Sequence, residues 1–80
     1  MMHSHDLSKH ELTAHEVEHL LEHWIEHNAS HSASFRERAT QVVAISPQAA
    51  EDIEQAAALM DQSTEMLKKA LQDLQDPKIR

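Results

Sequence analysis

The chain has no glycine among its 80 residues, and Ser46-Pro47 is the clearest interruption of its apolar pattern. A serine followed by proline is typical of a helix N-terminus, because serine accepts hydrogen bonds from free backbone amides and proline fits the first helical position. Tight β-hairpins need positive φ angles, which glycine adopts most easily. The sequence therefore favours long helices on either side of a short connection near residue 45.

Before this connection, apolar residues recur at spacings of three and four, which is the heptad pattern of a helix that packs on another helix. The pattern predicts one helix over about 13–44. Its expected core positions are Val17, Leu21, Trp24, Asn28, His31, Phe35, Arg38 or Ala39, and Val42.

Two features of this first helix leave alternatives. Thr13 with Glu16 fits a capping box, and so does Ser8 with Glu11. Thr13 is the favoured start, because sustained periodicity begins there. The segment 28–32 has weaker helix formers, so the alternative to one long helix is a three-helix bundle with a break near 28–32.

The same pattern after Ser46 predicts a second helix over 47–75, which ends before Pro77. Its expected core positions are Ala49, Ile53, Ala56 or Ala57, Met60, Ser63 or Thr64, Leu67, Ala70 or Leu71, and Leu74. Two long helices joined by a connection of about two residues must pack antiparallel. We therefore predict an all-α antiparallel helical hairpin, with a polar His-containing tail at 1–12, one helical domain at 13–76 and a C-terminal tail at 77–80.

Folding the chain at about residue 45 predicts which residues face each other. Trp24 then lies opposite Leu67, and the polar residue Asn28 lies opposite Ser63 or Thr64. Large side chains face small ones in several layers, as close packing prefers.

Apolar side chains outside the two stripes indicate a second packing surface. Leu20, Leu59 and Met66 widen the stripes beyond the width that one neighbouring helix covers. A chain this short buries a modest core and usually gains stability from a metal or a partner. We therefore expect a homodimer in which two hairpins form a four-helix bundle.

Histidine is the compositional anomaly, with eight residues in 80. Five of them, His15, His19, His23, His27 and His31, recur every four residues. Residues four apart are neighbours on one helix face, so consecutive imidazoles can chelate one divalent ion. Each step also advances about 40° around the helix, so the row drifts towards the apolar stripe. His27 and His31 are therefore the preferred ligands, followed by His23, because packing orders them best.

Glutamates lie three residues after three of these histidines, at Glu18, Glu22 and Glu26, and can complete a coordination shell or orient an imidazole. Such donors favour Ni, Zn, Cu or Co over Ca or Mg. The alternative is a solvated polar face without a metal and, for His31, a histidine hydrogen-bonded in the core.

The N-terminal tail holds further nitrogen donors. His3 is third from the α-amine, so that the amine, two backbone amides and the imidazole form a square-planar set suited to Cu(II) or Ni(II). His5 lies close by. The alternative is a tail with scattered histidines and no site.

Composition argues against several classes of protein. The chain has no cysteine for a disulfide or thiolate site, and no glycine for a phosphate-binding loop. It is acidic, with a formal charge of −7, one Trp and one Phe, which disfavours nucleic acid. Glu16-x-x-His19 matches an element of di-iron bundles, but the other required glutamates are absent, so we expect no enzyme. Without a long apolar run or a signal-peptide pattern, we expect a cytoplasmic protein that does not contact membranes.

These patterns lead to two functional expectations. The first is a small metal-binding protein for the buffering, delivery or sensing of Ni, Co, Zn or Cu. The alternative is a non-enzymatic protein-interaction or pH-responsive helical module without a metal. Protonation of all eight histidines would take the formal charge from −7 to about +1.

The run His23-Trp24-Ile25-Glu26-His27-Asn28-Ala29-Ser30-His31, with the Ala/Glu-rich stretch 50–57, resembles a family of small uncharacterised His-rich proteins. The likeness covers about residues 13–75. It implies a helical fold and a link to metal handling, and it assigns no functional residues. The chain departs from this pattern at Arg38, where an aromatic residue is expected.

Overall fold

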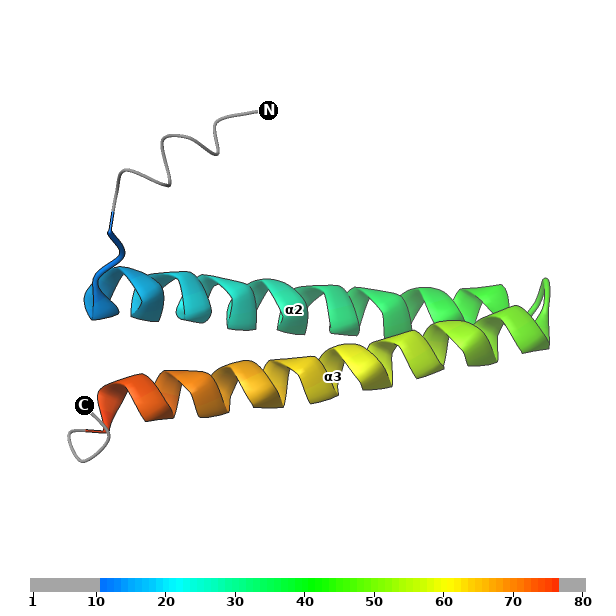
Figure 1. Cartoon of the computed structure of the whole chain (residues 1–80). Coiled ribbons are helices and arrows are strands. Elements are labelled where there is room, and N and C mark those ends of the chain that lie inside the picture. The colour runs from blue at the N-terminus through cyan, green and yellow to red at the C-terminus, as the bar shows by residue number, and fades with distance from the viewer. Residues whose placement is uncertain (1–10, 77–80) are drawn as a thin grey trace.

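The computed structural model describes residues 11–76, which form two helices joined by a tight turn (Figure 1). Helix α2 spans Ala14–Val42 and helix α3 spans Pro47–Gln75. The helices lie side by side and antiparallel, so the start of α2 and the end of α3 are at the same end of the hairpin. The predicted all-α antiparallel hairpin is therefore confirmed.

Helix α2 is continuous through residues 28–32, so the alternative of a break there is wrong. Weak helix formers cost only tenths of a kcal/mol each, and packing against α3 offsets that cost at Ser32, which is buried. The helix also continues past Arg38 and ends at Val42, two residues before the expected end. It ends there because the amides of Ile45 and Ser46 both donate to the Val42 carbonyl at 2.8 Å, which closes a turn.

Both helix N-termini are capped as predicted. The Glu16 amide donates to Thr13 Oγ1 at 3.1 Å, and the Thr13 amide donates to Glu16 Oε1 at 2.9 Å, which completes the capping box. In α3 the Ala49 amide donates to Ser46 Oγ at 3.1 Å. The competing start at Ser8 lies outside the described residues.

The interface between the helices is made mainly by small side chains. Four apolar residues are buried there, namely Leu21, Ala39, Ala50 and Ala57. Two polar residues, Ser32 and Thr64, are buried with them. Close approach of the two backbones follows from this choice of alanine and serine at the points of contact.

Two predicted core positions on α2 are wrong. Trp24 is 44% exposed and His31 is also exposed, while Ile25 is half-buried and Ser32 is buried in their places. Each correction moves the stripe by one residue, or about 100° around the helix. At His31 the physical reason is space, because Ser32 lies against the Ala57 carbonyl, where an imidazole ring does not fit. At Trp24 the stripe passes instead through Ile25, which lies seven residues before Ser32 on the same face of the helix.

The two helices pair in the predicted register, but a different pair of polar residues makes the contact between them. Ser32 Oγ lies 3.5 Å from the Ala57 carbonyl oxygen and 2.6 Å from Asp61 Oδ1, which matches a fold at about residue 45. The pairing of Asn28 with Thr64 is not the polar contact, because the Thr64 hydroxyl donates to Met60 in its own helix at 2.9 Å.

The hairpin leaves many large apolar side chains in contact with water. No large side chain is fully buried among residues 11–76. Leu20, Leu59 and Met66 lie outside the interface, as the width of the stripes indicated. Neither α2 nor α3 combines the length and hydropathy needed to cross a bilayer.

Candidate functional site

Five histidines form a row along α2, and all five side chains are exposed. The ring centroids of His15 and His19 are 5.5 Å apart with the rings perpendicular. Those of His23 and His27 are 5.8 Å apart with the rings nearly parallel. The i, i+4 spacing therefore places consecutive imidazoles beside each other, as the sequence predicts.

The tightest of these contacts joins His27 and His31. Their Nε2 atoms are 3.0 Å apart, and their ring centroids are 4.4 Å apart at an interplanar angle of 75°. Without a metal, one of these nitrogens donates a hydrogen bond and the other accepts it. Two nitrogen ligands of a single ion, each about 2.0–2.1 Å from it, lie about 3.0–3.4 Å apart. The Nε2–Nε2 distance therefore lies within the range of two nitrogen ligands of one ion, and rotation of the rings would turn both nitrogens towards that ion.

An aromatic residue of α2 contacts this pair. The ring of His31 contacts Phe35, with centroids 6.1 Å apart and a tilt of 45°. Phe35 is half-buried, so it connects the histidine pair to the interface with α3. Trp24 lies one turn before His27 on the same side and keeps 44% of its surface exposed. Contact with Phe35 restricts the His31 ring and favours a preformed pair.

The first three histidines of the row lie in a different place. A shallow open groove on α2 is lined by Leu12, His15, Glu16, His19, Leu20 and His23. Glu16, the carboxylate among the residues that line it, is already bonded in the capping box with Thr13. These imidazoles are therefore available to solvent but lack the close nitrogen–nitrogen approach of the His27/His31 pair.

No group of three or more His, Asp or Glu side chains within residues 11–76 is arranged to hold one metal ion. The expected contribution of Glu18, Glu22 and Glu26 to a three-donor group is therefore absent from this part of the chain. His3 and His5 lie outside the described residues. The chain as described offers pairs of imidazoles, not a closed coordination shell.

Hydropathy did not indicate the polar cluster that links the two helices. Ser32 Oγ donates to Asp61 Oδ1 at 2.6 Å, and Arg36 Nη1 donates to Ser32 Oγ at 2.6 Å. Arg36 Nη2 lies 2.8 Å from Asp61 Oδ2. The hydrogen bond from Ser32, followed by that from Arg36, lowers the pKa of Asp61 below its usual value. The spacing of Ser32 and Arg36 by four residues is the only sequence signal for this cluster.

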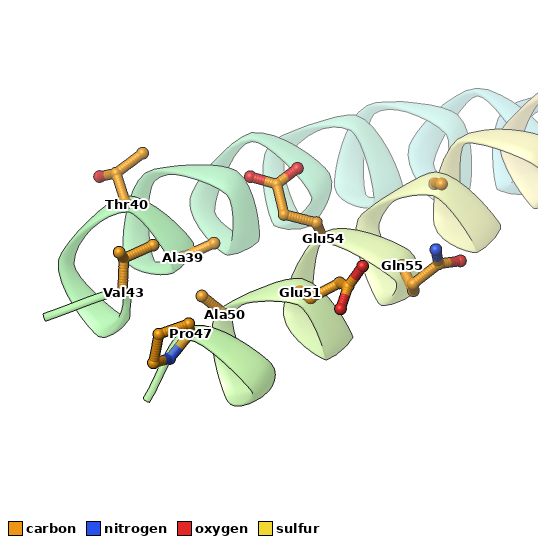
Figure 2. Close-up of a pocket in the computed structure, with 9 residues that line it drawn as sticks. Ala39, Thr40, Val43, Pro47, Ala50, Glu51, Glu54 and Gln55 are labelled. Carbon is orange, nitrogen blue, oxygen red and sulfur yellow. The ribbon is translucent and has the colours of Figure 1, made fainter. Parts of the chain in front are cut away.

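A groove between the helices near the turn carries a different chemistry. Figure 2 shows Ala39 and Val43 of α2 facing Ala50 of α3, with the carboxylates of Glu51 and Glu54 at its rim. None of the residues that line it is a histidine. This groove is therefore separate from the histidine row.

The fold and the histidine row define a small helical-hairpin protein with exposed imidazole pairs on one helix. The chain belongs to the family described as Domain of unknown function (DUF8180), whose match covers residues 17–74. This match includes most of both helices and four of the five histidines of the row. No curated protein and no solved structure matches the chain.

Proposed function

We propose that this protein binds a divalent transition-metal ion, one of Ni, Zn, Cu or Co, through His27 and His31. The observation that carries the proposal is the 3.0 Å separation of their Nε2 atoms on one face of α2. His23 stacks on His27 and is the next donor along the row. His15 and His19 form a second, weaker pair nearer the start of the helix.

The choice of metal follows from the donor atoms. Imidazole nitrogen suits Zn, Cu, Ni and Co, whereas Ca and Mg take oxygen ligands. A separation of 3.0 Å corresponds to two ligands at about 90° and about 2.1 Å from the ion, while a tetrahedral ion requires about 3.4 Å. Ni and Cu therefore fit the observed separation with the least movement.

The biological role that we propose is metal buffering, delivery or sensing, carried out without catalysis or nucleic acid. We propose separately that the chain forms a homodimer, because Leu20, Leu59 and Met66 keep apolar surface exposed outside the interface between α2 and α3. An acidic chain with a formal charge of −7 also raises the local concentration of cations near the row.

A protein-interaction module without a metal is the second candidate. The observation that favours it is the exposure of large apolar side chains, with Trp24 at 44%, Leu59 at 63% and Met66 at 65%. Exposed apolar surface of this kind is typical of interaction sites. Association that changes with pH but not with a chelator would support this candidate.

Calorimetric titration of the metal-free protein with Ni, Cu and Zn tests the proposal. We expect binding with a dissociation constant of about 1 μM or below, and a large loss of affinity in the double variant His27→Ala/His31→Ala. The matched control is His15→Ala/His19→Ala, which removes an i, i+4 pair from the same helix. The proposal fails when the wild type binds no metal, or when both double variants lose affinity equally.

A further inference from the structure

One side of the hairpin carries uncharged residues from both helices, and nothing else in the described chain covers it. On α2 these residues follow each other at spacings of three or four, namely Leu20, Trp24, His27, His31 and Phe35. On α3 small residues recur every seven positions, namely Ala49, Ala56, Ser63 and Ala70. We call these two rows together the open flank.

Helix geometry places both rows on the same side of the hairpin. Leu20 directly precedes the buried Leu21, and Ala56 directly precedes the buried Ala57. Each row is therefore rotated by about 100° from its buried residue in the same sense. In two antiparallel helices this rotation brings both rows to one side of the interface.

The opposite side of the hairpin is polar. The ion pair between Arg36 and Asp61 crosses it at 2.8 Å, and the two side chains are 44% and 49% exposed. The nine residues of the open flank, in contrast, include no Asp, Glu, Lys or Arg. The first charged residues beside them are Asp52, one turn after Ala49 on α3, and Arg38, which follows Phe35 on α2. Of these two sides of the hairpin, the open flank is therefore the one suited to close apolar packing.

The size of the open flank matches a dimer interface. Two helices of 29 residues are about 43 Å long, and with an axial separation of 8–10 Å they present a face about 18 Å wide. This gives about 800 Å², which is the area that each partner buries in a standard stable complex.

The histidine pair lies at the centre of this surface. The midpoint of α2 is residue 28, and the centre of the His27/His31 pair is residue 29. With a two-fold axis at this point, α2 and the α2 of a second copy pack antiparallel along the whole length of both helices. His27 then lies beside the partner's His31. The contacts of Ser32 with Ala57 and Asp61 show which residues of α3 lie level with each residue of α2. At this register, the same axis passes α3 near residue 62.

The small residues of α3 agree with this axis. Ser63 is one residue from this axis and so lies close to the partner's Ser63, and Ala56 lies about two residues along the helix from the level of the partner's Ala70. Small side chains at these positions allow the two α3 helices to approach closely. Both rows of the open flank are therefore compatible with one symmetric arrangement.

We propose that a second copy of this chain covers the open flank, with the two-fold axis at His27/His31, and that the two histidine pairs together offer four nitrogens to one ion. The shared ion rests on the proposed metal-binding function, whereas the dimer itself does not. Each chain alone supplies two nitrogens, and structural zinc sites take four ligands. Imidazoles enclosed between apolar surfaces also need polar partners, which the second pair and the ion provide.

Cross-linking of full-length cysteine variants tests the arrangement, because the chain has no cysteine of its own. With a short bismaleimide, Ser63→Cys is expected to give a covalent dimer at low protein concentration. The matched control is Ser30→Cys, which places the same exposed residue on the side of α2 away from α3. Failure of Ser63→Cys to cross-link, or equal cross-linking of both variants, would overturn the proposed interface.

The metal content of the dimer tests the shared site separately. We expect one Ni or Zn ion per two chains in native mass spectrometry, and loss of that ion in Ser63→Glu, which places charge on the open flank. One ion per chain, bound at His27/His31 in a monomer, overturns the shared site and leaves the proposed function intact. A Ser63→Cys dimer that binds no ion overturns both the shared site and the proposed function.

Discussion

The hydroxyl of Ser32 donates a 2.6 Å hydrogen bond to Asp61 and so joins the middle of α2 to the middle of α3. Arg36 reinforces this contact by donating to both groups. In an interface built mainly from alanine and leucine, a directional contact of this kind fixes the register, because sliding either helix leaves a buried hydroxyl without a partner. The contact therefore determines which side of the hairpin is polar.

Replacement of Asp61 by asparagine should make the hairpin less dependent on pH. The hydrogen bonds from Ser32 and Arg36 hold the pKa of Asp61 in the folded protein below the ordinary aspartate value of 3.8. The carboxylate therefore contributes stability above that value, and this stability is lost as the pH falls through the folded-state pKa. Urea unfolding at neutral pH and at pH about 3 should show a smaller difference in Asp61→Asn than in the wild type.

The control for this measurement is Asp73→Asn, which removes an exposed carboxylate from the same helix. It should retain the pH dependence of the wild type. Equal pH dependence in Asp61→Asn and the wild type would show that the contact with Ser32 and Arg36 contributes nothing to stability.

Enlargement of Ala57 should separate the helices. Ala57 has 0% exposure, and Ser32 of the facing helix packs against its carbonyl oxygen. Ala57→Leu is expected to lower the free energy of unfolding by about 1–3 kcal/mol, because the interface has no space for the added methyl groups. Ala33→Leu, at an exposed position of α2, should change it by less than about 0.5 kcal/mol. Urea denaturation compares the two, and equal effects would contradict close packing at Ala57.

Loss of the N-terminal cap of α2 should destabilise the first turn of that helix. Thr13 Oγ1 accepts a hydrogen bond from the Glu16 amide, and the Thr13 amide donates one to Glu16 Oε1. Thr13→Ala is expected to cost about 1 kcal/mol. Amide hydrogen exchange over residues 14–17 should accelerate by about fivefold, with little change in α3. Uniform acceleration in both helices would show instead that the cap acts on the whole hairpin.

The sequence was sufficient for the hairpin because its signals agree with each other. The stripes of apolar residues, the capping box at Thr13 and the Ser46-Pro47 pair each indicate the same two helices. The sequence did not show that Trp24 and His31 lie outside the interface between the helices. A stripe moved by one residue, through positions 25 and 32, has the same spacings of three and four. At positions 31 and 32 the short distance between the helices favours serine over the larger histidine.

The histidine row was predictable as a pattern but not as a geometry. The spacing of four places the rings side by side, yet it does not distinguish His15 and His19 from His27 and His31. The structure distinguishes them, because the contact with Phe35 orients His31 and the two Nε2 atoms approach to 3.0 Å. The clustering of Ser32, Arg36 and Asp61 depends on the register between the helices. A fold at about residue 45 predicts that register only approximately.

A double-mutant cycle on metal affinity tests the central claim most directly. Affinities for Ni and Cu are measured by calorimetry for the wild type, His27→Ala, His31→Ala and the double variant. When both nitrogens bind one ion, each single variant loses at least about tenfold in affinity, or about 1.4 kcal/mol, and the double variant loses little more. Small losses that add independently, or affinity that is unchanged in all three variants, would contradict a metal site at His27 and His31.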